Sequence, residues 1–210
     1  MSETTENHSR VAQLGRWLAE LILVFVGVYA AFWLNNYQQH QQNLQRHDQI
    51  LATLENQLRE GIASSSANAA RSDREVAEFK RALAAGEMPP LGMYSFSSDY
   101  SASDIATLLQ AGGIELLDVK TLTALRDLES VIRNGLAQVA HFQKLSDELI
   151  VPNLDQDISF FYDPATKKLR KRFEKYPDAL QMTATFFHAL EKAQTDLLKQ
   201  IQIERLRRER

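Results

Sequence analysis

One nearly continuous run of apolar residues lies close to the start of the chain. Residues 17–34 read WLAELILVFVGVYAAFWL, in which Glu20 is the single charge, and the uninterrupted apolar stretch covers residues 21–34. Over this stretch apolar residues occupy every side of a helix, whereas a surface helix of a soluble domain keeps a polar stripe. Its short length also suits a buried core helix or the core of a signal peptide, so the pattern alone leaves these alternatives open.

Aromatic residues at both ends of the run favour a transmembrane helix. Trp17 and Trp33 are the only tryptophans and bracket the run, and Tyr37 follows one turn later, as in the aromatic belts of membrane–water interfaces. The two tryptophans lie ~24 Å apart along a helix, which is short of a ~30 Å hydrocarbon core but workable with snorkelling side chains. We predict a transmembrane helix over 17–36, with Trp17, Trp33 and Tyr37 as interface anchors.

A cleaved signal peptide is the main competing interpretation. Val28 and Ala30 are small residues at the two positions that a signal peptidase reads, but the apolar run continues to Leu34, which suits an uncleaved anchor better.

Basic residues are unequally distributed around the run. Arg10 and Arg16 precede it, and residues 35–54 hold only Arg46, which weakly favours a cytoplasmic N-terminus over residues 1–16 and an extracytoplasmic remainder.

Small residues mark one side of the predicted membrane helix. Gly27 and Ala31 form a small-x-x-x-small pair, which lets two backbones approach closely in lipid, and Glu20 and Asn35 project from the same side. We expect this stripe to support self-association, although such residues are common in membrane helices. Glu20 either handles protons or simply snorkels to the headgroups.

The helical pattern continues beyond the membrane segment. Leu44, Leu51, Leu54 and Leu58 form a short heptad seam that stops where the matching positions become Gly61 and Ser65. Val76, Phe79 and Leu83 resume an apolar face before Gly86 and the Pro89-Pro90 pair, which are stop signals. The simplest interpretation is one helix over about residues 10–84, whose part at 37–84 is a stalk with coiled-coil character.

The pattern over residues 85–210 predicts a helical head that packs on the stalk. Its expected elements are a loop over 87–102, a short helix from Ser103 or Asp104 to Gly112-Gly113, a helix over 118–150, a small hairpin or loop over 153–176, and a last helix over 177–208. The predicted fold class is therefore mainly α, with a transmembrane helix that continues into a long stalk helix and a helical-bundle head.

Charge and composition exclude several classes of protein. The chain carries 24 Lys and Arg against 27 Asp and Glu, a net charge of −3, whereas proteins that coat nucleic acid are normally basic. Cysteine is absent, which excludes disulfides, thiolate zinc sites and cysteine nucleophiles. We therefore expect no nucleic-acid partner.

No motif predicts an active site, a cofactor site or a metal site. His40 and His47 lack a neighbouring carboxylate pair, and His141 and His188 lie on apolar faces, which predicts core or boundary positions. Residues 153–157 begin like a calcium loop but lack its glycine and its final glutamate. The terminal run 205–210 is expected to be a solvated helix end, with contact to headgroups or an acidic partner as the alternative.

Part of the sequence resembles an uncharacterised bacterial family of single-pass membrane proteins. The resemblance covers residues 16 to about 130 in patches, and it lies in Glu20-Leu21-Ile22-Leu23-Val24, Gly27-Val28, Ala31, Asn35-Asn36-Tyr37, and Thr107 to Leu117 with Gly112-Gly113. Ala19 stands where that family has glycine, and Tyr37 where it has tryptophan. The resemblance implies an extracytoplasmic helical domain and supplies no activity or catalytic residue.

These observations predict a non-enzymatic bitopic protein of the bacterial inner membrane with a periplasmic C-terminal domain. Its expected partners are the lipid bilayer, a second copy of the chain, and another membrane or periplasmic protein. One alternative is a subunit of an ion-conducting or force-transmitting membrane complex that uses Glu20, and a further one is a ligand-sensing, receptor-like head.

Overall fold

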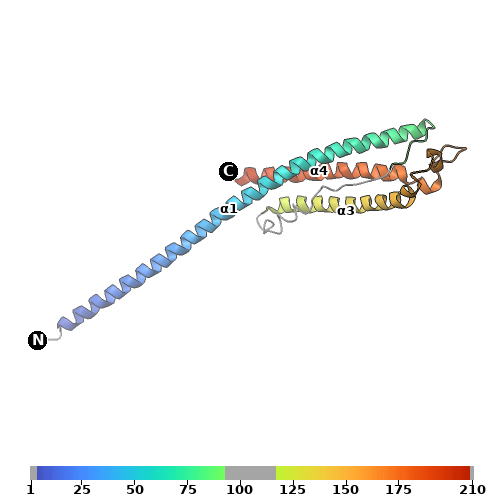
Figure 1. The fold of residues 1–210 in the computed structure, drawn as a ribbon. Coiled ribbons are helices and arrows are strands. Elements are labelled where there is room, and N and C mark those ends of the chain that lie inside the picture. The colour runs from blue at the N-terminus through green and yellow to red at the C-terminus, as the bar shows by residue number, and fades with distance from the viewer. Residues whose placement is uncertain (1–3, 93–116, 209–210) are drawn as a thin grey trace. The chain divides into compact units, whose positions relative to one another are not determined.

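The computed structural model describes residues 4–92 and 117–208, and these are mainly α-helical, as predicted (Figure 1). The α-helices are α1 (Thr4–Ala84), α3 (Val119–Leu149) and α4 (Tyr176–Arg208), and the short 3-10 helices are η3 (Val151–Asn153), η4 (Ile158–Phe161) and η5 (Lys171–Phe173). The predicted helices over 10–84, 118–150 and 177–208 are confirmed. The short helix expected between Ser103 and Gly113 lies outside the described residues.

The chain divides into two compact units, Met1–Gln49 and Ile50–Arg210. Helix α1 supplies the described part of the first unit and one of the three long helices of the second. The second unit, which we call the bundle, begins at Ile50 and not at residue 85, where the sequence analysis placed the head. Residues 50–84 of the predicted stalk therefore belong to the bundle itself.

Helix α1 ends at Ala84, two residues before Gly86, which was predicted as a stop signal. Gly86 has a φ of 74°, a conformation that residues with a Cβ rarely adopt. The backbone N–H of Glu87 donates to the carbonyl of Ala82 at 2.9 Å, and that of Gly86 donates to the carbonyl of Leu83 at 3.1 Å. These bonds satisfy carbonyls that the helix end would otherwise leave unpaired, as in a Schellman motif.

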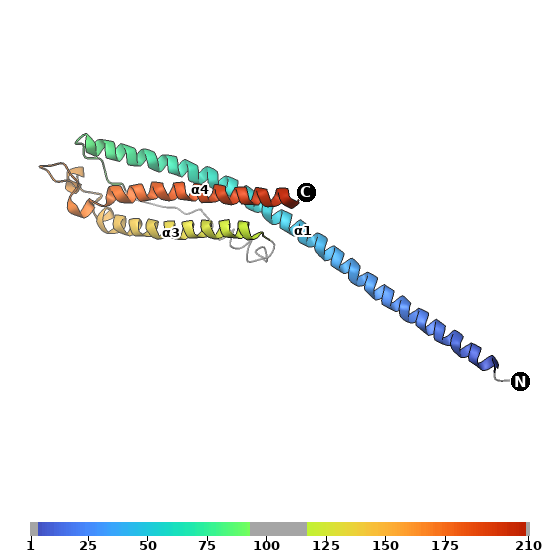
Figure 2. The same ribbon diagram turned by 180° about the vertical axis from the view of Figure 1, so that it is seen from behind.

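In the bundle, α4 runs antiparallel to both other helices (Figures 1 and 2). Hydrogen bonds join Glu55 to Arg205, Ser65 to Gln194 and Lys80 to Gln181, so the residue number in α4 falls as that in α1 rises. In the same way Thr121, near the start of α3, bonds Glu204, near the end of α4. Residues 50–84 of α1 and α3 are therefore parallel to each other.

The buried positions of each helix alternate in steps of three and four residues, which is the spacing of packed coiled-coil helices. In α3 they are Thr121, Leu125, Leu128, Ile132, Gly135, Val139, Phe142 and Ser146. In α4 they include Thr183, Phe187, Leu190, Gln194, Leu197, Ile201 and Glu204, and in α1 Leu51, Leu54, Leu58, Gly61, Ser65, Ala69, Ser72, Val76 and Phe79. Two consecutive steps of four at Ser65 and Ala69 are a stutter, which locally unwinds the packing.

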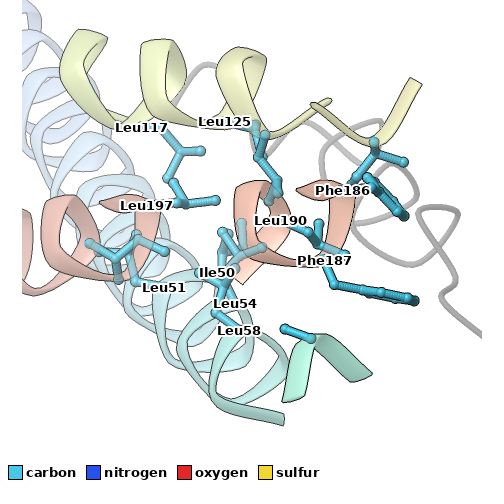
Figure 3. Packing of buried hydrophobic residues seen from close by; sticks show 14 of the residues in the cluster. Ile50, Leu51, Leu54, Leu58, Leu117, Leu125, Phe186, Phe187, Leu190 and Leu197 are labelled. Atoms are coloured by element: carbon cyan, nitrogen blue, oxygen red, sulfur yellow. The ribbon is translucent and has the colours of Figure 1, made fainter. Parts of the chain in front are cut away.

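The predicted seam leucines lie in this core. Leu51, Leu54 and Leu58 are at most 1% exposed and point toward Leu190 and Leu197 of α4, with Leu125 of α3 nearby (Figure 3). Leu44, which belongs to the first unit, is 37% exposed. The seam also does not stop at Gly61 and Ser65, because both are buried. Leu51, Leu54 and Leu58 thus pack inside the bundle and are not available as a seam between stalks.

A second apolar cluster closes the end of the bundle opposite Ile50. Its buried members are Phe79, Leu91, Phe142, Ile150, Phe161, Tyr162, Phe173 and Tyr176. Tyr162 Oη donates to the carbonyl of Pro89, and Tyr176 Oη accepts from the N–H of Gly92 at 3.0 Å. Burial raises the pKa of Tyr162 to about 12, so its phenol keeps the proton that it donates.

The region predicted as a hairpin or loop contains a small hairpin turn. Tyr162 and Leu169 form an isolated antiparallel bridge. Within the turn, Asp163 Oδ1 accepts from the backbone N–H of Ala165 at 3.0 Å and of Thr166 at 2.9 Å. Lys167 completes the turn with a φ of 54°. The side chain of Asp163 thus holds a turn that brings Lys167 and Lys168 to its outside, where both are exposed.

Candidate functional site

The first candidate site is the apolar stretch of α1. Every residue from 21 to 34 is exposed, and the large apolar side chains among them are 52–76% exposed. In the described part of the chain, one helix is long and apolar enough to cross a membrane, and it lies near the N-terminus. Exposed contiguous apolar surface of this extent marks an interaction with a membrane or a protein.

The predicted interface anchors are exposed aromatic side chains at the two ends of this stretch. Trp17 is 74% exposed, Trp33 64% and Tyr37 52%. The rings of Trp33 and Tyr37, one helical turn apart, stack with centroids 6.0 Å apart. Both therefore project from one side of α1, and their polar N–H and O–H groups sit at the end of the apolar stretch that is nearer the bundle in sequence.

The predicted packing stripe is uncovered in the described structure. Gly27, Ala31 and Asn35 are exposed and recur every fourth residue of one helix, so they share a face. A Cβ added to Gly27 would meet nothing within 4 Å. The side chain of Glu20 lies outside the described ones. The stripe is thus open to a second helix, and nothing within the described chain occupies it.

Three of the four histidines whose side chains the structure describes are exposed. His40 is exposed, and His47 is buried with Nδ1 3.7 Å from the carboxylate of Asp48. His188 is exposed, which differs from its predicted core or boundary position, and its Nε2 lies 2.8 Å from Oδ2 of Asp73, which joins α4 to α1. His141 is exposed, so its predicted core or boundary position is wrong, because the apolar face of α3 that it seemed to share runs through Val139 and Phe142 instead.

The segment that resembles the opening of a calcium loop has a structural role. Asp157 accepts a hydrogen bond from the backbone N–H of Ser159 at 2.9 Å and so caps η4. These bonds to Ser159 hold the pKa of Asp157 below its ordinary value. Among the residues that the structure describes, no group of three or more His, Asp or Glu side chains is placed to hold a metal ion.

Glu204, directly before the terminal run 205–210, ties α4 to α3, whereas Leu206 and Arg207 within the run are exposed, as expected of a solvated helix end. Glu204 is 2% exposed, and its carboxylate accepts from Thr121 Oγ1 at 2.6 Å and from the backbone N–H of Asp118 at 3.1 Å. Asp118 is the N-cap of α3 and makes no side-chain cap bond of its own. Glu204 thus caps α3 from another helix, with its negative charge at the positive end of the helix dipole.

Three arginines form ion pairs at the same end of the bundle. Arg205 Nη1 lies 2.6 Å from Oε2 of Glu55, whose other oxygen accepts from Arg59 at 2.6 Å, and Arg207 lies 3.6 Å from Asp118. The hydrogen bond from Arg59, followed by those from Arg205 and Gln202, holds the pKa of Glu55 below its ordinary value of 4.5 against the opposing effect of burial. Arg205 and Arg207 therefore pair with carboxylates of the chain itself.

The lowered pKa of Glu55 predicts an acid-sensitive bundle. A carboxyl whose pKa is lower in the folded state stabilises that state above its unfolded pKa, and the stabilisation is lost as the pH falls through the folded value. We expect the thermal midpoint of the wild-type chain to fall more steeply below pH 4.5 than that of Glu55→Gln. Glu60→Gln, an exposed carboxyl on the same helix, should keep the wild-type profile. Equal slopes for Glu55→Gln and wild type would contradict the ion pairs.

The apolar stretch with its flanking aromatic and small residues can be recognised in the sequence, because each depends on local composition. The caps and ion pairs of α4 cannot, because their partners lie 83 and 150 residues away in the chain. Residues 167–175 were predicted only as part of a hairpin or loop, although their basic run is visible in the sequence. No family model, curated protein sequence or solved structure matches this chain, so the proposed function rests on the sequence and on the structural features described above.

Proposed function

We propose that the chain is a non-enzymatic bitopic membrane protein whose helical bundle mediates self-association and partner binding. Residues 17–36 cross the bilayer once in this proposal. The observation that carries it is the contrast between the two units. Residues 21–34 are apolar and exposed on every side, whereas Ile50–Arg210 has its own buried core. A helix that is apolar all round requires either a protein interior or lipid around it.

We further propose that the membrane is the bacterial inner membrane, with residues 1–16 in the cytoplasm and the bundle in the periplasm. Arg10 and Arg16 support this orientation, because basic residues are retained on the cytoplasmic side. A bundle without cysteines is compatible with that oxidising compartment.

Absence of cysteine makes the topology directly testable. Ser9→Cys and Lys192→Cys each introduce a single thiol, one in the leader and one on an exposed position of α4. In intact spheroplasts, a membrane-impermeant maleimide should label Lys192→Cys and should label Ser9→Cys only after lysis. The chain should stay in the pellet after extraction with alkaline carbonate. Release without detergent, or a mass that corresponds to cleavage after Ala30, would contradict the proposal.

Self-association through the small-residue stripe is tested by adding bulk to it. Gly27→Ile places a branched side chain where the wild type leaves open space, so two helices can no longer approach closely. We expect the dimer in detergent to weaken by about tenfold or more, as measured by sedimentation equilibrium. Phe25→Ile, two positions away and thus on nearly the opposite side of the helix, is the matched control. A monomeric wild type, or a dimer that Gly27→Ile leaves unchanged, would contradict self-association through the small-residue stripe.

A further inference from the structure

The end of the bundle opposite Ile50 carries a surface that the membrane segment and the core do not explain. Helix α3 ends at Leu149 and α4 begins at Tyr176, so all of residues 150–175 lie at this one end (Figure 1). We call these residues the tip. The tip combines a dense group of cations with exposed aliphatic side chains.

The cations of the tip outnumber its acids, six against four, and they lie in one stretch, whereas Asp155, Asp157 and Asp163 precede it. Six occur within nine positions, against the single acid Glu174: Lys167, Lys168, Arg170, Lys171, Arg172 and Lys175. All except Arg170 are exposed. Among the ion pairs of the described residues, none involves these side chains. Arg170 is half-buried and its charge acts on Asp163, whereas the four lysines and Arg172 are exposed to an external anion.

The framework beneath these cations is ordered. Arg170 Nε donates to the carbonyl of Tyr162 at 2.9 Å. The guanidinium of Arg172 lies 4.5 Å from the ring centroid of Phe160 and 4.6 Å from that of Phe173, within the range of cation–π attraction. Phe173 is buried in the second apolar cluster. The basic segment is thus fixed to the core at Arg170 and Arg172, and its four lysines are exposed on this framework.

Aliphatic side chains are exposed at the same end. Val151 in η3 is 38% exposed, Leu154 after it 51%, and Ile158 at the start of η4 42%. Exposed aliphatic residues beside Lys and Arg are the combination by which peripheral segments bind a membrane surface, since the aliphatic groups enter the headgroup region and the cations meet lipid phosphates. A nucleic acid would instead favour exposed aromatic rings for base stacking, and here Phe160 and Phe173 lie under Arg172.

We propose that the tip binds the surface of a bilayer that contains anionic phospholipids. The lysines and Arg172 contact headgroup phosphates, and Val151, Leu154 and Ile158 enter the headgroup layer. This goes beyond the proposed function, because it assigns a lipid surface to the bundle and not to residues 17–36. With both features present, one protein contacts lipid at a transmembrane helix and at a second, charge-dependent site.

The test uses the full chain in nanodiscs of phosphatidylcholine alone, so that residues 17–36 are occupied. These are mixed with sucrose-loaded vesicles of phosphatidylcholine with or without phosphatidylglycerol, and co-sedimentation is measured. We expect binding only to the anionic vesicles, with an affinity that falls as salt is raised. A chain that proves soluble without nanodiscs is tested directly with the same vesicles, so a failure of the transmembrane proposal does not decide this one.

The variants separate charge from apolar insertion. Replacing Lys168, Lys171 and Lys175 together by Gln should weaken binding by about 100-fold, from roughly fivefold per cation. The matched control replaces Lys120, Lys192 and Lys199 by Gln, which makes the same change in net charge at exposed positions of α3 and α4 outside the tip. Leu154→Ser with Ile158→Ser should weaken binding by about tenfold. Unchanged melting curves show that each variant remains folded.

Three results would overturn the proposal. One is equal binding by the tip variant and the wild type, and another is equal binding to neutral and anionic vesicles. The third is competition by soluble polyphosphate together with full binding by the Leu154 and Ile158 variant, which would show a general polyanion site without lipid insertion.

Discussion

Leu54→Asp is expected to unfold the bundle, while Leu44→Asp leaves it folded. Leu54 is 1% exposed in the core formed by three helices, whereas Leu44 is 37% exposed, although both belong to the same predicted seam. Removing a buried leucine side chain alone costs about 2–5 kcal/mol, and an aspartate in its place adds the cost of burying a carboxyl group. The sum is comparable with the about 5–15 kcal/mol that stabilises an ordinary domain.

Thermal unfolding of the full chain, followed by circular dichroism, distinguishes the two substitutions. Leu44→Asp should shift the midpoint little, because substitutions of exposed residues usually change stability by less than about 0.5 kcal/mol. A Leu54→Asp chain that melts like the wild type but loses its dimer would show that Leu54 faces a second copy. That outcome would support the predicted seam between the stalks of two copies and would contradict the assignment of Leu54 to the core of the bundle.

Gly135→Ala is expected to destabilise the bundle by about 2 kcal/mol, although alanine is the better helix former by about 1 kcal/mol. Gly135 is buried in α3 beneath the ring of Phe186, which points from α4 toward α3 (Figure 3). A Cβ at this position would lie 1.9 Å from Cε2 and 2.0 Å from Cδ2 of that ring. Phe186 is only 6% exposed and packs in the core, so its ring must shift within the core before a Cβ can fit at residue 135.

A double-mutant cycle identifies the cause. Phe186→Ala alone should cost about 3–5 kcal/mol, and in the Gly135→Ala background it should cost less by at least about 1 kcal/mol, because the overlap is removed. Asn134→Ala, at an exposed neighbouring position of α3, controls for helix propensity and should not destabilise. Additive effects of the two core substitutions would show that the ring does not rest on Gly135.

The helices could be predicted from the sequence because large apolar residues recur at the spacing of one helix face. Leu125, Leu128 and Ile132 define such a face in α3, and Gly86 with its positive φ ends α1 where a glycine stop was expected. These signals are local, so they do not depend on which helix lies opposite. The apolar stretch of residues 21–34 is also a local signal, and the structure shows these residues as part of a helix, as predicted.

The extent of the core could not be predicted in the same way. Gly61 and Ser65 interrupt the hydrophobic pattern, yet both are buried, and Ser65 Oγ donates to Gln194 Oε1 at 2.8 Å across 129 positions of sequence. A buried polar pair is stable only when its hydrogen bond is made, and the sequence does not show the partner. The boundary of the bundle was therefore placed too late, at residue 85 in place of Ile50.

The position of α4 determines when the protein can fold during its synthesis. Because α4 follows α1 and α3 in the sequence, the apolar face at Leu51, Leu54 and Leu58 lacks its partners Leu190 and Leu197 until α4 has been synthesised. At about 5–20 residues per second, the nascent chain keeps this face uncovered for on the order of 10 seconds. A premature stop codon even shortly before Glu204 deprives α3 of its cap and α1 of Arg205, so the bundle acquires these contacts only once α4 has been made.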